Sequence, residues 1–332
     1  MTTLCHSSAQ GGATDDMRYG WTTSVGPGIY VRDIAVAADG TAWIATAAGI
    51  SRIERQPITL ADKAAHYETL IDARHRRFGY VTVADLARPG DVSEWSLADT
   101  DNDGLWTGMY GAGECFRYAA TKDPQARLRA TGVFQAMNRL HAVTGIPGFP
   151  ARTVLPTSGP NPNDTYPAER DRRSQQNDPL WKVVTPRWPK SADGAWYWKC
   201  DTSSDEIDGH FFFYAAFHDL VARPGAEKAK AAGIIRAMTD HIIEHDFHLV
   251  DHDGRPTRWG VWNPGKLNND IAWIKERGLN SLEMLSFLAT AHHVTGDDKY
   301  VKITRDLVDN HHYAINMQNQ KVTFPPEAIN HS

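Results

Sequence analysis

The chain has 332 residues, of which 41% are hydrophobic and 10% aromatic, so it can bury a sizeable core in one large domain or in two. Its net charge is -5 and its basic residues are scattered, which argues against nucleic acid as the main partner. It lacks a run of about eighteen apolar residues, so we expect no membrane partner either, and its three cysteines do not make a disulfide framework.

The N-terminal part of the chain begins with a polar stretch. Residues 1–20 are rich in glycine and serine, so we expect them to be poorly ordered. They also lack the basic start and the apolar core of a signal peptide. If the full-length protein carries such a peptide, the expected location is periplasmic or extracellular.

Residues 29–55 show the pattern of short strands joined by tight turns. Asp39-Gly40 is typical of a hairpin turn, and Gly49 marks a second turn before a third strand from Ile50 to Ile53. The order of strand, Asp-Gly, Trp-Ile-x-Thr strand and Gly-Ile-Ser-Arg resembles a two-component-regulator-type β-propeller repeat. We therefore predict a propeller-like strand segment over residues 21–56. A single blade cannot bury its faces, so the chain is expected to be a piece of a longer protein.

The remaining chain has mainly helical periodicity. A first helix is predicted over residues 60–77, and three helical hairpins follow after residue 99. The predicted hairpins are 104–121 with 124–144, 205–222 with 226–247, and 279–295 with 299–312. In the last two, the first helix is apolar almost all round and the second is amphipathic, which indicates an inner and an outer layer. On helix 104–121, the apolar residues Leu105, Met109, Ala112, Phe116 and Ala119 are predicted to share one face.

The junction between the last two helices carries a family resemblance. Thr290-Ala-His-His-Val-Thr-Gly-Asp-Asp-Lys-Tyr300, followed by Ile303 and Leu307, resembles the junction that recurs in six-hairpin glycosidase-like (α/α)6 toroids. The resemblance implies a mainly α fold, with an incomplete toroid of hairpins over residues 57–332. It also implies that the loops entering the inner helices, 99–107, 201–210 and 276–281, gather at one end.

These three loops supply the candidate catalytic residues. Glycoside hydrolysis needs two carboxyl groups on opposite sides of the scissile bond. Asp103, paired with Asp205 or Asp208, is predicted to provide them. His210 lies one turn into the apolar helix and is a candidate for assisting acid–base catalysis; the alternative is a hydrogen-bonded core histidine.

The first loop also matches the start of a calcium loop. Asp99, Asp101 and Asp103 precede Gly104 in the pattern D-x-D-x-D-G. An EF-hand needs a glutamate at the twelfth position, where Tyr110 stands, so the loop is not an EF-hand. Three interpretations stay open: calcium with other ligands, a turn that caps the helix, and a catalytic or sugar-binding carboxylate. No other cofactor is expected.

Aromatic and basic residues in the long inserts suit a carbohydrate ligand, including an acidic one. The predicted substrate-binding residues are Trp106, Arg258, Trp259, Trp262 and Asn280. The alternative is that the aromatic side chains cover the hydrophobic surface of the ring.

The sequence therefore predicts a glycan-active enzyme whose substrate is an oligo- or polysaccharide. A glycoside hydrolase is the leading interpretation, and a polysaccharide lyase is the alternative within enzymes. A non-catalytic carbohydrate-sensing or ligand-binding module is the alternative from another class. The sequence contains no Gly-rich phosphate loop, G-x-S-x-G or H-E-x-x-H motif, so nucleotide-binding, serine-hydrolase and metalloprotease functions have little support.

Overall fold

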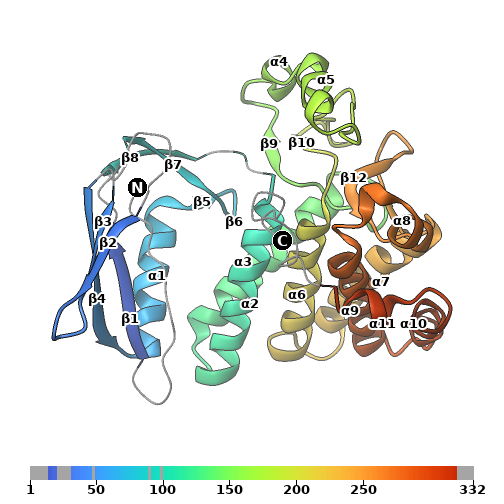
Figure 1. Cartoon of the computed structure of the whole chain (residues 1–332). Coiled ribbons are helices and arrows are strands. Elements are labelled where there is room, and N and C mark those ends of the chain that lie inside the picture. Colours follow the sequence, from blue (N-terminus) through green and yellow to red (C-terminus); the bar gives the residue numbers. More distant parts are fainter. Residues whose placement is uncertain are drawn as a thin grey trace. The chain divides into compact units, whose positions relative to one another are not determined.

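The computed structural model describes residues 14–20, 31–46, 49–88, 91–97, 99 and 101–319, and it is mainly α-helical (Figure 1). The chain divides into two compact units, Met1–Arg77 with Thr82–Ala98 and Phe78–Val81 with Asp99–Ser332. The predicted boundary lay near residue 57, whereas this division places the first helix with the N-terminal strands. None of the described helices is long and apolar enough to cross a membrane.

The first unit contains a four-stranded antiparallel sheet in the order β1–β4–β3–β2. Its strands are β1 Thr14–Gly20, β2 Val31–Val36, β3 Ala42–Thr46 and β4 Gly49–Ile58. The three predicted strands are confirmed, and Gly40 in the predicted turn has a φ of +84°, which glycine adopts without strain. Residues 14–20 were expected to be poorly ordered but pair with β4, and residues 1–13 lie outside the described part.

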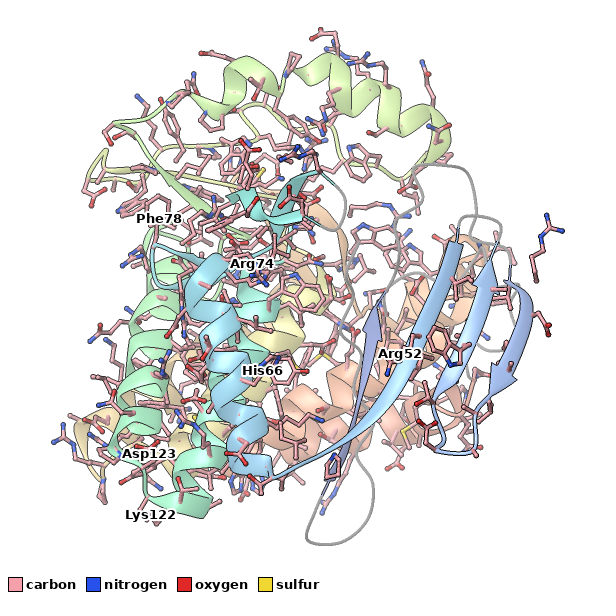
Figure 2. The ribbon with its side chains drawn as sticks, turned by 90° about the vertical axis from the view of Figure 1, so that its left-hand side faces the viewer. Arg52, His66, Arg74, Phe78, Lys122 and Asp123 are labelled. Atoms are coloured by element: carbon pink, nitrogen blue, oxygen red, sulfur yellow. The ribbon has the colours of Figure 1, made fainter. Side chains whose placement is uncertain are left out.

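Helix α1 Leu60–Arg74 follows the sheet. It begins at Thr59, whose hydroxyl oxygen accepts a hydrogen bond from the backbone N–H of Asp62 at 3.1 Å. It ends at Arg74 (Figure 2) rather than at residue 77, because His75 leaves the helical conformation. The unit also contains β5 Arg76–Arg77 and an antiparallel hairpin of β7 Ala84–Arg88 and β8 Asp91–Leu97.

The second unit contains the three predicted hairpins. They are α2 Asp103–Thr121 with α3 Pro124–Ala142, α6 Ser204–Leu220 with α7 Ala226–Glu244, and α9 Arg277–Thr295 with α10 Lys299–Asp309. The other elements are β6 Tyr80–Val81, β9 Val154–Pro156, α4 Pro162–Thr165, α5 Ala168–Asn177, β10 Trp196–Trp198, β11 His248–Val250, β12 Pro256–Val261, α8 Pro264–Asn269, a 3₁₀ helix Ile271–Trp273 and α11 Tyr313–Asn316.

The break between α2 and α3 shows why the hairpin boundaries could be predicted. Lys122 adopts a left-handed conformation with a φ of +57°, which ends α2. The carboxylate of Asp123 then accepts a hydrogen bond from the backbone N–H of Gln125 at 2.9 Å and caps α3 (Figure 2). Both signals are local, so they can be read from the sequence.

The hairpins pack in two layers. The first helices α2, α6 and α9 contact one another in series, and α3, α7 and α10 pack behind them (Figure 1). Helix α3 contacts both α2 and α6, and α7 contacts both α6 and α9. The inner and outer layers expected from the sequence are therefore present in the three described hairpins.

Small residues bring α2 and α6 unusually close. A Cβ on Gly108 would lie 2.3 Å from the carbonyl oxygen of Gly209, so the two backbones touch. On the predicted apolar face of α2, Ala112 is fully buried, whereas Met109 and Phe116 are each 51% exposed. Because the glycine face of α2 packs closely against α6, this apolar face is only partly covered, and Leu105 and Met109 line a groove beside α6.

Candidate active site

Helix α6 carries the acid-rich stretch at its start. Ser203 precedes the helix with an extended backbone, and Asp205 and Glu206 lie in the first turn, where the helix dipole favours negative charge. Residues three or four apart share a helix face, so Asp205 pairs with Asp208 and Glu206 pairs with His210. The first pair is half-buried and the second pair is fully buried.

Asp205, Asp208 and Glu283 form a group that we call the carboxyl cluster. Glu283 comes from α9, is buried, and accepts a hydrogen bond at Oε2 from the indole N–H of Trp262 at 2.7 Å. Burial and the charge of Asp205 raise the pKa of Asp208 to about 7, although a hydrogen bond with Glu283 acts in the opposite direction. Burial and the charge of Asp208 raise the pKa of Glu283 well above its usual range. The Asp208–Glu283 pair therefore keeps a proton near neutral pH.

Asp208 also lines an open groove of about 410 Å³. We call it the apolar groove, and its other lining residues come from α2, α6 and α9: Leu105, Met109, Phe211, Phe212, Ala215, Ser286, Phe287 and Thr290. Asp208 thus presents a carboxyl group to a surface that is otherwise apolar or hydroxyl-bearing. A ligand in the groove would reach the carboxyl cluster through Asp208.

A second group on the other face of α6 is enclosed, and we call it the interior cluster: Asp103, His141, Glu206 and His210. The Thr153 hydroxyl donates to Asp103, and the Gly104 N–H donates to Glu206 Oε1 at 3.2 Å. His210 Nδ1 and His141 Nε2 are 3.0 Å apart and share a hydrogen bond.

Burial determines the protonation of the interior cluster. It raises the pKa of Glu206 well above its usual range, lowers the pKa of His210 well below its usual range, and lowers the pKa of His141 to about 3. Asp103 and His210 were predicted to be catalytic, but both side chains are 0% exposed. They are therefore held away from any sugar that binds at the surface.

Two of the three predicted calcium ligands lie beside the same lysine, and the third lies elsewhere. Asp101 lies 2.6 Å and Asp99 lies 3.7 Å from the Lys199 ammonium nitrogen, whereas Asp103 belongs to the interior cluster. Burial raises the pKa of Asp101, but the charges of Arg152 and Lys199 outweigh this effect and hold it at about 2. The positive charge of Lys199 thus already pairs with the two exposed carboxylates of the D-x-D-x-D-G loop.

Three of the predicted substrate-binding residues have other roles. Arg258 forms two hydrogen bonds with the Asp178 carboxylate, at 2.6 and 3.0 Å, and stacks 3.8 Å over the ring of Trp259. Trp262 is fully buried and donates to Glu283, so it cannot serve as a sugar platform. Asn280 is 2% exposed and donates to the backbone at 2.9 Å.

Two predicted aromatic contacts keep accessible surface. Trp106 on α2 has a 43% exposed side chain, which leaves its ring open to a ligand. Trp259 is half-buried beneath the guanidinium of Arg258. Of the predicted platforms, Trp106 is therefore the one with the more open ring.

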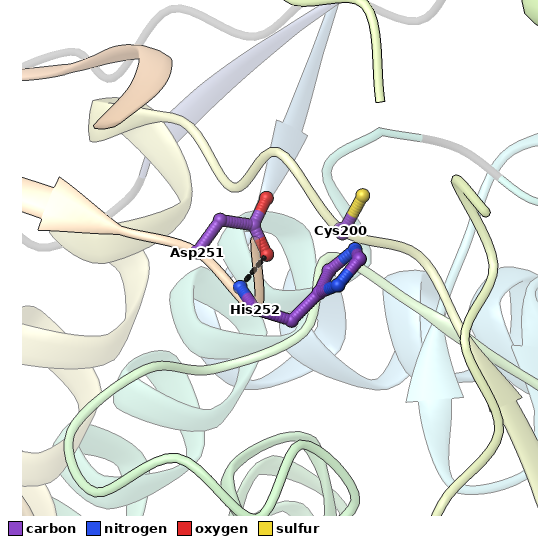
Figure 3. A group of neighbouring side chains, drawn as sticks. All are labelled: Cys200, Asp251 and His252. Carbon is purple, nitrogen blue, oxygen red and sulfur yellow. Dashed lines mark hydrogen bonds between the residues drawn. The ribbon is translucent and has the colours of Figure 1, made fainter. Parts of the chain in front are cut away.

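Cys200, Asp251 and His252 form a further cluster whose potential ligand atoms lie within 4.8 Å of one another (Figure 3). Burial and the charge of Asp251 raise the pKa of the Cys200 thiol well above its usual range. Asp251 is already paired with the Lys182 ammonium at 3.2 Å and accepts the Asp201 N–H at 2.8 Å. The Cys200 thiol therefore stays neutral, and the Asp251 carboxylate already has a basic partner. This arrangement suits a structural role that holds residues 182, 200 and 251 together, rather than a metal site.

The sequence interpretation missed Glu283. Its signal was present, because Glu283 is a single acid between Leu282 and Met284 in a helix with few polar positions. The carboxyl cluster depends on a residue far from Asp208 in sequence, so only the packing of α6 against α9 reveals it. No protein family, curated protein or solved structure matches the chain in the comparisons made. The functional argument therefore rests on side-chain geometry.

Proposed function

We propose that the helical unit is a glycan-active enzyme, namely a glycoside hydrolase that reacts at the carboxyl cluster. The observation that carries the proposal is the convergence of three carboxyl groups from α6 and α9, one of which lines an open groove. Glycoside hydrolysis requires one carboxyl group that donates a proton and another that acts as base or nucleophile. A cluster with a retained proton beside a further carboxylate meets that requirement.

Each member of the cluster has a distinct role in this proposal. Asp208 is the general acid, because its pKa of about 7 keeps the proton available near neutral pH and its side chain faces the groove. Glu283 is a positioning residue that shares the proton and is held in turn by Trp262. Asp205, one helical turn before Asp208, supplies the second carboxylate.

The surface around the cluster supports a carbohydrate ligand. Phe212 lines the groove and is 43% exposed, and aromatic rings of this kind stack on the apolar faces of sugars. Ser286 and Thr290 add hydroxyl groups to the groove lining. The combination of ring faces and hydrogen-bonding groups suits a molecule that is apolar on its faces and polar at its edges.

The test is an assay of the chain with a panel of neutral and acidic oligosaccharides. Hydrolysis releases reducing ends without a product that absorbs in the near ultraviolet. Asp208→Asn should lower turnover at least about 100-fold, because it removes the proton donor. A product that absorbs in the near ultraviolet would show that the chain cleaves the substrate by elimination, and it would contradict hydrolysis. Ligand-induced stabilisation without turnover would instead indicate a binding module.

A further inference from the structure

A second cavity in the helical unit has other lining residues than the apolar groove and a different character. We call it the polar cavity; it has a volume of about 670 Å³. Its wall includes Asp99, Asp101, Tyr166, Arg170 and Lys199. Helices α4 and α5, which stand at one end of the second unit in Figure 1, form one side of it.

The two basic residues of the polar cavity differ in their partners. Lys199 is paired with both Asp99 and Asp101, at 3.7 and 2.6 Å. Arg170 is exposed, and its guanidinium lies 4.3 Å from the ring centroid of Tyr166. Among the described residues, no carboxylate forms an ion pair with Arg170. Its positive charge therefore stays available to an anionic group of a ligand.

The opposite part of the wall offers hydrogen-bond acceptors. The side chains of Asp99 and Asp101 are 42% and 51% exposed, so their oxygen atoms can accept hydrogen bonds from hydroxyl groups. Tyr166 fixes the position of the Arg170 guanidinium through a cation–π contact. A ligand that complements this cavity carries an anionic group at one end and hydroxyl groups at the other.

One arginine connects the polar cavity with the carboxyl cluster. Arg152 donates from Nε to the carbonyl oxygen of Asp101 at 2.6 Å and from Nη2 to the hydroxyl oxygen of Ser203 at 3.1 Å. The Ser203 hydroxyl in turn donates to Asp205. Hydrogen bonds through Arg152 and Ser203 thus link the backbone at the wall of the polar cavity to Asp205 of the carboxyl cluster.

We propose that the polar cavity is a subsite for an acidic sugar, with Arg170 binding its carboxylate and Asp99 and Asp101 accepting its hydroxyl groups. This inference deepens the proposed glycan activity and rests on it for the carbohydrate class of the ligand. The substrate class is accordingly an oligosaccharide that contains uronic acid. Arg170 is the residue that distinguishes it from a neutral oligosaccharide.

The experiment measures binding by calorimetry in the full chain with Asp208→Asn, so that turnover does not consume the ligand. The probes are trisaccharides of glucuronic, galacturonic and mannuronic acid, each compared with its carboxyl-reduced form. At least one acidic trisaccharide should bind about tenfold more tightly than its reduced form, the range expected for one charge-assisted hydrogen bond. Adding Arg170→Gln should remove that preference.

Arg172→Gln is the matched control, because Arg172 lies on the same helix, is exposed and does not line the cavity. It should keep the preference. Equal binding of acidic and reduced forms, or a preference that survives Arg170→Gln, would overturn the subsite. If the chain hydrolyses neutral oligosaccharides and no acidic ones, the acidic subsite is wrong and the proposed hydrolase activity is supported. A preference that depends on Arg170, together with an absence of turnover by the chain in which Asp208 is intact, would overturn hydrolysis and support the subsite.

Discussion

The two faces of helix α6 both carry acidic residues, but these residues differ in their access to a ligand. Asp205 and Asp208 belong to the carboxyl cluster, and Asp208 reaches the apolar groove. Glu206 and His210, on the other face, are enclosed against α2. Burial raises the pKa of Asp208 and of Glu206 alike. A shifted pKa therefore does not by itself identify a reactive residue; access to a ligand separates the two faces.

The close approach of α2 explains the difference. A Cβ on Gly104 would lie 2.2 Å from Glu206 Oε2 and 2.9 Å from His210 Nε2, so the glycine makes room for both polar atoms. Neither atom has a hydrogen-bond partner among the described residues. The glycine face of α2 thus closes over one side of α6, while the other side faces the groove.

The largest effect is expected from separating α2 and α6. Gly108→Ala places a Cβ 2.3 Å from the Gly209 carbonyl oxygen, and backbone atoms cannot move aside cheaply. The free energy of unfolding should fall by about 3 kcal/mol or more. Gly113→Ala on the same helix meets no atom within 4 Å and should raise it by about 0.5 to 1 kcal/mol. Denaturant unfolding measures both, and equal effects would contradict the close contact.

The second test asks which face of α6 reacts. Glu206→Gln keeps the shape of a buried side chain that already favours its neutral form, so turnover should stay within about threefold of the unchanged chain. This contrasts with the loss of about 100-fold expected for Asp208→Asn. Steady-state rates on the responsive oligosaccharide decide the comparison. If Glu206→Gln folds but loses its turnover, the reactive residues belong to the interior cluster and not to the carboxyl cluster.

A smaller effect is expected from the residue that shares a proton with Asp208. The hydrogen bond from Glu283 lowers the pKa of Asp208, and an amide N–H is a weaker donor than a carboxyl O–H, so Glu283→Gln should raise the pKa of Asp208. A general acid loses activity as pH rises above its pKa, so the alkaline limb of the pH–rate profile should move up by as much as about one pH unit. Glu206→Gln is the control that leaves this limb in place. If the alkaline limb does not move in Glu283→Gln, Glu283 does not influence the protonation of Asp208 and has no place in the proposed site.

The smallest effect concerns stability against pH. The pKa of Asp208 rises from 3.8 to about 7 on folding, so its contribution is full below pH 4 and is lost as pH rises through about 7. The melting temperature should therefore fall by several degrees over this window. The fall should be smaller in Asp208→Asn, whose amide does not titrate. Thermal scans from pH 4 to 8 check this, and parallel curves would show that Asp208 is not shifted by burial.

Part of the candidate site could be predicted from the sequence. Asp205 and Asp208 were identified because acids at the start of an apolar helix are a local pattern. Asp103 and His210 were selected by the same pattern and proved to be buried, because the pattern does not show which side of α6 is covered. Trp262 was selected for its ring but is enclosed, and its contribution is the hydrogen bond that holds Glu283.

The sequence by itself determined the order of the elements: the hairpin strands around Asp39-Gly40, the three helical hairpins, and their breaks at residues such as Lys122 and Asp123. These features depend on periodicity, turns and caps, which act over a few residues. Only the tertiary structure decided that α2 meets α6 through Gly108 and that Glu283 joins Asp208. Burial and pairing of charges arise between helices distant in sequence, and they determine which acid can react.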